Sequence, residues 1–223
     1  MDTELVRDGL IKFISGVLLV GLLLFIPAGT FAFPAGWRFM GVLFVPMLIG
    51  GLVMLFFKPE LLRKRLNAKE EQTEQRGVIA ASGIMFIAAF AVAGLTFRFG
   101  WIRFPKPIPF IGAVLFLSGY ALFAEVLREN EYLSRTVEVQ KDQRVVDTGL
   151  YGIVRHPMYA ATLVLFLSMA LVLESPISFA IMLVYPALLV VRIRNEEEVL
   201  EEGLQGYREY KKRVKYRLIP FVW

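Results

Sequence analysis

The sequence contains no cysteine and a single histidine, His156. Without cysteine the chain forms no disulfide, carries no thiolate nucleophile and offers no sulfur ligand to a metal ion. One imidazole excludes metal centres that need several histidines, so we expect no metal cofactor. The sequence also lacks internal repeats and any glycine-rich turn placed after a strand pattern, which excludes a soluble Rossmann-type α/β fold.

Charge is missing from six long stretches of the chain. Hydrophobic residues make up 57% of the 223 residues, and the charged 20% gather between the apolar runs. A helix that rises about 1.5 Å per residue needs about 20 apolar residues to cross a hydrocarbon core of about 30 Å. We therefore predict an all-α integral membrane bundle with about six membrane helices, over residues 13–37, 39–57, 78–97, 107–124, 157–173 and 175–191.

The last two apolar stretches differ from the others in length. Each has 17 residues, which gives a helix of about 25 Å, and Glu174-Ser175-Pro176 joins them through a tight turn. We expect a short helical hairpin. The prediction is a single membrane domain over 1–223, with four transmembrane helices in 1–127. A cytoplasmic loop, the hairpin and a C-terminal helix then form the catalytic region in 128–223.

The basic residues indicate the orientation of the bundle. If the N-terminus is cytoplasmic, 21 of the 25 lysines and arginines fall on the inner side, as basic residues in short loops do. Both termini are therefore predicted to be cytoplasmic, and the first apolar run is too long for a cleaved signal peptide. The pI of about 9.5 follows from this topology and from contact with anionic membrane lipid, and gives no support to nucleic-acid binding.

Chemistry-bearing residues cluster in the second half of the chain. Arg155, His156 and Tyr159 stand where Pro157, a favoured first helical residue, starts the fifth helix. A helix N-terminus suits an anionic group, although arginine and tyrosine also serve as interfacial anchors. Arg192 and Glu196 lie four residues apart and so share one helical face. The neighbouring acids, Glu197 and Glu198, fit a solvated helix as well as they fit a site.

Several of these motifs occur in an order and spacing that resemble the isoprenylcysteine carboxyl methyltransferase family over roughly residues 140–220. The motifs are Gly149-Leu150-Tyr151, Arg155-His156-Pro157-Met158-Tyr159, Pro176 in the hairpin turn, Glu196-Glu197, Tyr207, Tyr210 and Arg217-Leu218-Ile219-Pro220. The resemblance implies a membrane methyltransferase that uses S-adenosylmethionine and acts on a carboxylate of a lipid-like or prenylated acceptor.

The same resemblance implies the roles of individual residues. Arg192 would face the acceptor carboxylate, and Glu196 would act in catalysis and contact the cofactor. Gln143 departs from the histidine often found at its position in the family. The implied cofactor-binding residues are Gln143, Arg144, Val145, Val146, Tyr151, Arg155, His156, Pro157, Met158, Tyr159, Glu196 and Glu197.

Physical chemistry agrees with these roles and leaves alternatives open. A carboxylate acceptor is already a nucleophile and chiefly needs alignment, which a bidentate Arg192 supplies, while acids and tyrosine rings stabilise a cationic cofactor. One alternative is an NADPH-dependent sterol-type reductase, because such enzymes share an Arg-His-Pro-x-Tyr element. Another is a phospholipid N-methyltransferase, whose amine acceptor must first lose a proton. A transporter fits less well, because the first four apolar stretches hold no charge at mid-membrane.

Overall fold

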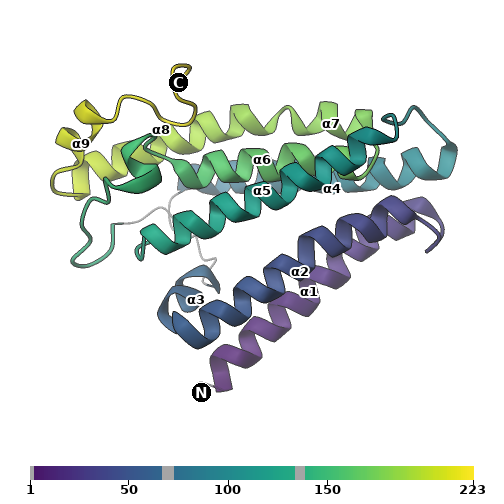
Figure 1. Cartoon of the computed structure of the whole chain (residues 1–223), viewed down its shortest axis with the longest axis horizontal. Coiled ribbons are helices and arrows are strands. Elements are labelled where there is room, and N and C mark those ends of the chain that lie inside the picture. The colour runs from purple at the N-terminus through teal and green to yellow at the C-terminus, as the bar shows by residue number, and fades with distance from the viewer. Residues whose placement is uncertain (1–2, 67–72, 134–138) are drawn as a thin grey trace.

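The computed structural model describes residues 3–66, 73–133 and 139–223, and in these ranges it consists of helices, turns and loops without a strand. The helices α4, α5, α6 and α8 run roughly parallel to the long axis, and α1 and α2 form a pair beneath them that runs obliquely to that axis (Figure 1). In chain order the elements are α1 Thr3–Ala28, α2 Pro34–Phe57, α3 Pro59–Leu66, α4 Thr73–Phe99, α5 Pro107–Glu129, the 3-10 helix η1 Gly149–Gly152, α6 Pro157–Val172, α7 Pro176–Met182, α8 Tyr185–Gly203 and α9 Tyr207–Arg213.

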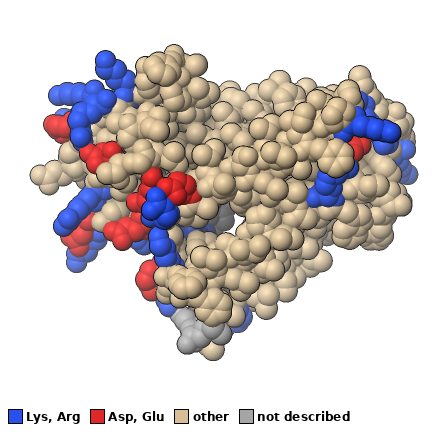
Figure 2. All heavy atoms as spheres, in the orientation of Figure 1, with Lys and Arg blue, Asp and Glu red and all other residues tan. Residues whose placement is uncertain are grey.

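Among the described residues, five helical stretches are long and apolar enough to cross a membrane, namely α1, α2, α4, α5 and the consecutive α7 and α8. The apolar α6 has 16 residues, which corresponds to about 24 Å. Figure 2 shows charged side chains gathered at one end of the molecule, a smaller group at the opposite end and a wide uncharged surface between them. The predicted all-helical, multi-pass membrane architecture is therefore confirmed.

The predicted end of the first membrane helix, at residue 37, is wrong. α1 already ends at Ala28, because Gly29 adopts a φ of +70°, a left-handed conformation that closes helices. The next helix then starts at Pro34, where the missing N–H of proline costs nothing. The turn between these helices carries no charged residue, so the absence of charge does not distinguish it from the helices on either side.

The last predicted span, 175–191, is also corrected by the structure. α7 ends at Met182 and α8 begins at Tyr185. Pro186 occupies the second position of α8 and has no N–H to continue the preceding helix, which accounts for the break. α8 then extends past residue 191 to Gly203. The expected turn at Glu174-Ser175-Pro176 is confirmed, since α6 ends at Val172 and α7 starts at Pro176.

Close packing of α5 against α6 brings together the two helix ends that flank the site. A Cβ atom at Gly112 would lie 2.6 Å from Leu171 Cβ, and one at Gly119 would lie 2.7 Å from Leu165 Cγ. Glycine at both positions lets the two helices approach closely, as small residues do at membrane helix interfaces. The two helices run antiparallel, so the C-terminal end of α5 stands beside the start of α6 (Figure 1).

The more highly charged end of the bundle, which carries α3 and α9, is called the charged end below. Both the N- and C-terminal labels lie toward this end (Figure 1). The short helix α3 buries Leu61 and Leu62, while its basic residues Lys64 and Arg65 remain partly exposed. Lys64 donates to the carbonyl of Glu131 over 3.1 Å, which connects α3 to the loop that follows α5.

Candidate functional site

The start of α6 is fixed to the C-terminal segment of the chain. Pro157 is the first residue of α6, which confirms the start predicted from the sequence. The backbone N–H groups of Arg155 and His156 donate to the carbonyls of Tyr216 and Arg217, both over 2.9 Å. The segment after α9 therefore forms a wall beside the entry to α6, although about 60 residues separate the two in sequence.

Glu197 forms the centre of a buried charge cluster next to this wall. Its side chain is 3% exposed. Arg155 Nε donates to one carboxylate oxygen over 2.7 Å, and Arg217 Nε donates to the other over 3.0 Å. His156 Nε2 lies 3.3 Å from the first oxygen, and Lys211 Nζ lies 3.7 Å from the second. A buried carboxylate needs such partners, since an unpaired buried charge is strongly destabilising.

The guanidinium of Arg155 donates hydrogen bonds to three other residues of the protein. Besides Glu197, its Nη1 donates to the carbonyls of Val214 over 2.7 Å and Lys215 over 2.9 Å. These contacts tie α6, α8 and the C-terminal segment together. Arg155 and Glu197 were both predicted to bind a cofactor; the structure pairs them with each other, with Arg155 lining the pocket and Glu197 outside its lining.

Tyr159 lies between Arg192 and Glu196. Arg192 Nε donates to the hydroxyl oxygen of Tyr159 over 2.8 Å, and that hydroxyl donates to Glu196 Oε2 over 2.5 Å. The Arg192 guanidinium also lies over the Tyr159 ring, at 5.8 Å from its centroid. One turn of α8 thus brings the predicted pair onto a common face, and a tyrosine from α6 joins a cation to an anion.

The turn η1 is held from two sides. Gly149 adopts a φ of +53°, and the N–H of Leu150 donates to Glu129 Oε2 over 2.9 Å. Tyr151 accepts a hydrogen bond from Asn130 at its hydroxyl over 2.9 Å and one from the Tyr210 hydroxyl at its carbonyl over 2.7 Å. α5, η1 and α9 therefore position Tyr151 together.

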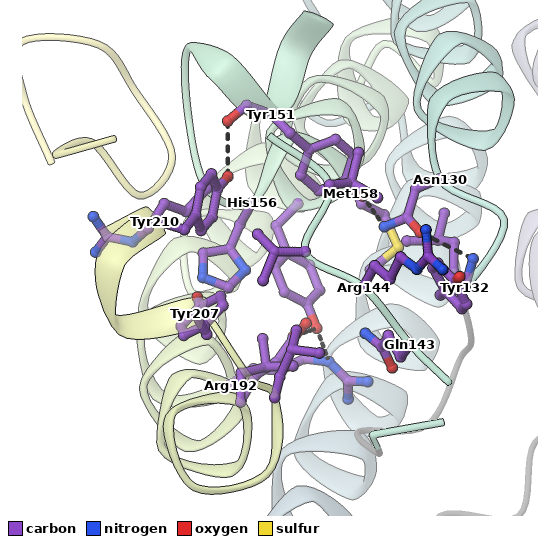
Figure 3. Close-up of a pocket in the computed structure, with 18 residues that line it drawn as sticks. Asn130, Tyr132, Gln143, Arg144, Tyr151, His156, Met158, Arg192, Tyr207 and Tyr210 are labelled. Atoms are coloured by element: carbon purple, nitrogen blue, oxygen red, sulfur yellow. Dashed lines mark hydrogen bonds between the residues drawn. The ribbon is translucent and has the colours of Figure 1, made fainter. Parts of the chain in front are cut away.

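These elements enclose a pocket at the charged end, with a volume of about 830 Å³ that includes the solvent at its mouth. Figure 3 shows its lining side chains converging from α6, α8, α9 and the loop before η1. The predicted site residues that line it are Gln143, Arg144, Val145, Val146, Tyr151, Arg155, His156, Met158, Tyr159, Arg192 and Glu196.

Two predicted residues do not line the pocket, and others were missed. Pro157 starts α6 without reaching the pocket, and Glu197 lies behind its wall. The sequence reasoning missed Asn130, Tyr132, Leu133, Leu200, Leu204, Tyr207 and Tyr210 as pocket residues. Tyr207 and Tyr210 belong to the C-terminal motif and offered a signal, whereas the three leucines look like any other apolar residue.

The two tyrosines of α9 differ in how their hydroxyls are bonded. Burial raises the pKa of both Tyr207 and Tyr210 above its usual value, because an apolar environment disfavours the charged phenolate. Tyr210 donates to Tyr151, as described above. The buried hydroxyl of Tyr207 has no hydrogen-bond partner among the described residues. A neutral, unsatisfied polar group therefore stands in the wall of the pocket.

A bundle of apolar helices with a pocket at its charged end defines a multi-pass membrane protein. Residues 110–202 match the model of the isoprenylcysteine carboxyl methyltransferase family, which confirms the resemblance seen in the sequence motifs. The matched range runs from α5 to the end of α8 and contains η1 and the Arg192–Tyr159–Glu196 group.

The fold is similar to that of the solved eukaryotic intramembrane Ras methyltransferase ICMT (isoprenylcysteine carboxyl methyltransferase). The TM-score is 0.55 at 21% sequence identity, over 92% of this chain and 74% of that one. A curated relative is the Delta(14)-sterol reductase TM7SF2 of Mus musculus, which is 34% identical over 91 residues. That alignment covers 40% of this chain and 22% of the reductase, so the chain spans only a minor part of that relative.

Proposed function

We propose that this chain is an integral membrane methyltransferase that transfers a methyl group from S-adenosylmethionine to a carboxylate on a lipid-like or prenylated acceptor. The observation that carries this proposal is the Arg192–Tyr159–Glu196 group in the pocket. It places a guanidinium, which suits a carboxylate, one helical turn from a carboxylate, which suits a sulfonium. The family match over residues 110–202 supports the same reaction.

The pocket residues fit the cofactor. Aromatic Tyr151 and Tyr207, apolar Met158 and Leu204 and acidic Glu196 line one pocket. An adenosine group needs apolar and aromatic surface, and the cationic remainder needs an anion and hydrogen-bond partners. When bound, S-adenosylmethionine supplies an electrophilic methyl group.

The residues of the chain then have separate tasks. Arg192 orients the acceptor carboxylate through its planar fork of donors, and Glu196 balances positive charge on the cofactor. The carboxylate is the nucleophile and needs no general base, so alignment is the main contribution of the protein. Tyr159 keeps Arg192 and Glu196 at a fixed separation through its two hydrogen bonds.

Orientation in the membrane is part of the proposal. We place the charged end, with both termini and the pocket, on the cytoplasmic side. The support is the predicted excess of basic residues in the loops and termini at that end. An acceptor with an apolar tail would then reach the pocket from the membrane while its polar end meets Arg192.

A transfer assay tests the reaction. The purified protein in lipid nanodiscs is incubated with methyl-labelled S-adenosylmethionine and an S-farnesylcysteine derivative that has a free carboxylate. We expect label in a base-labile methyl ester, and none when the carboxylate is replaced by a carboxamide. Transfer to the amide, or no transfer while the protein still binds S-adenosylhomocysteine, would contradict the proposed acceptor.

A sterol-type reductase is the second candidate, and the 34% identity to the mouse sterol reductase over 91 residues favours it. It would require an NADPH site in this pocket. Isothermal titration of the same preparation with S-adenosylhomocysteine and with NADPH separates the two functions. Binding of NADPH without S-adenosylhomocysteine would replace the methyltransferase proposal. A phospholipid amine acceptor is disfavoured by Arg192, since its positive charge repels an ammonium group.

A further inference from the structure

The loop formed by residues 216–223, called the C-terminal loop below, turns apolar side chains away from the protein. Phe221 is 88% exposed and Val222 is 74% exposed. The value for Phe221 is the highest of the large apolar side chains in the described part of the chain. Leu218 of the same loop is buried in the main core. The loop is therefore fixed to the bundle on one side and presents an apolar tip on the other.

Hydrogen bonds and ring packing determine the shape of this loop. The backbone N–H groups of Arg217 and Leu218 donate to the main-chain oxygen of Trp223, both over 2.9 Å. The ring of Phe221 lies 5.2 Å from that of Tyr216, measured between centroids. Phe221 has a φ of +66°, which is unfavourable for a bulky residue. Strain of this kind occurs at functional segments, so the outward position of Phe221 indicates a surface that it meets.

The position of the C-terminal loop points to the membrane as that surface. Figure 1 places the loop at about the same level along the long axis as α3, and α3 begins at Pro59, directly after the membrane helix α2 ends at Phe57. At this place Figure 2 shows an uncharged projection that continues the wide uncharged surface of the bundle and has basic side chains beside it. The apolar tip therefore lies at the level where the chain leaves the membrane, a level at which aromatic residues are enriched.

Basic residues flank the apolar tip. Residues 207–223 contain six lysines and arginines and a single acid, Glu209. Three of the six pair with acids elsewhere in the chain. Lys212 and Lys215 are exposed and have no ion pair among the described residues. Acidic lipid headgroups attract basic residues next to a membrane, so a bilayer with acidic lipids matches both the apolar tip and the lysines beside it.

We infer that the C-terminal loop is a membrane anchor. Phe221 and Val222 enter the interfacial region of the leaflet at the charged end, and Lys212 and Lys215 contact the headgroups of acidic lipids. This assignment does not depend on the reaction that takes place in the pocket. The same loop accepts the backbone hydrogen bonds from Arg155 and His156 described above, so the anchor connects the entry of α6 to the bilayer surface.

A spin label tests the anchor. Val222→Cys introduces a unique thiol into the cysteine-free chain, and a nitroxide attached there is studied by power-saturation EPR in nanodiscs of phosphatidylcholine and phosphatidylserine. Oxygen, which concentrates in lipid, should relax this label more strongly than a water-soluble nickel complex does. Gln205→Cys, exposed in the turn before α9, is the matched control and should show the opposite preference.

Two outcomes would overturn the anchor. One is relaxation of the label at position 222 by the nickel complex to the same extent as in the Gln205→Cys control. The other is a label at position 222 that is shielded from both reagents, because protein, such as a second copy of the chain, would then cover the tip.

Lipid charge is tested with the same label. The preference for oxygen at Val222→Cys should fall when phosphatidylserine is omitted, and the added substitutions Lys212→Gln and Lys215→Gln should remove this dependence on lipid composition. A preference that does not change with lipid charge, or a dependence that persists without the two lysines, would overturn the assignment of acidic headgroups to them.

Discussion

Arg155 and Glu197 form a buried ion pair, with 2.7 Å between Arg155 Nε and Glu197 Oε1 and only 3% of each side chain exposed. The pair joins the entry of α6 to the middle of α8, and Arg217 extends it to the C-terminal segment. Because Arg155 itself lines the pocket, the ion pair fixes one side of the pocket wall. The function proposed for Arg192 and Glu196 depends on it without using its atoms.

Glu197→Ala should strongly destabilise the protein. The substitution leaves Arg155 buried without its carboxylate, and breaking a buried pair from one side costs about 3–5 kcal/mol. Thermal unfolding of the detergent-solubilised protein measures the change. The exposed neighbour Glu198 provides the control, because Glu198→Ala should shift stability by no more than about 0.5 kcal/mol. Equal melting of both variants would show that the cluster does not hold the fold together.

Arg192→Ala and Glu196→Gln should affect different steps, the first the use of the acceptor and the second the binding of the cofactor. The first should lower kcat/KM for the acceptor by a factor equivalent to about 2–4 kcal/mol of lost transition-state stabilisation, with cofactor affinity nearly intact. The second should instead weaken binding of the cofactor. Arg192→Lys keeps the charge but loses the planar fork, so it should stay clearly impaired. Arg194→Ala, an exposed site on the same helix, is the control. If the two residues only paired on a solvated helix, effects of about 0.3–0.5 kcal/mol without this division would be measured.

Gly149→Ala should weaken cofactor binding through Tyr151. A Cβ atom at this position would lie 1.6 Å from Glu129 Oε1, and the φ of +53° is strained for alanine. The carboxylate that holds Leu150 must then move, and η1 moves with it. We expect a lower Tm and a higher Kd for S-adenosylhomocysteine. Gly83→Ala, where an added Cβ meets no atom within 4 Å, should leave that Kd unchanged.

The absence of cysteine makes the orientation directly testable, since any introduced thiol is unique in the chain. Lys141 and Lys106 are exposed on opposite sides of the predicted topology. In sealed cells, a membrane-impermeant maleimide should label Lys106→Cys, and it should label Lys141→Cys only after the membrane is opened. The reverse pattern would invert the topology and place the pocket outside the cytoplasm.

The helical membrane architecture was predictable from local features. Apolar length decides whether a segment stays in lipid, since each backbone polar group there must be satisfied within the helix. Pro157 marks the start of α6 through its missing N–H, a property of one residue. The common face of Arg192 and Glu196 follows from helical periodicity alone. The family motifs likewise lie within a short stretch of the chain, where spacing in sequence is informative.

The ends of the helices and the partners within the site depended on the tertiary structure. The turn after Ala28 contains no charge, so composition cannot distinguish it from the helix that precedes it. Arg155 and Glu197 looked like two groups open to a ligand, and only packing of segments 42 residues apart assigned each to the other. Tyr207 received its place in the pocket from the turn at Gly206. Burial and pairing are properties of three-dimensional neighbours, and a residue's own side chain does not specify them.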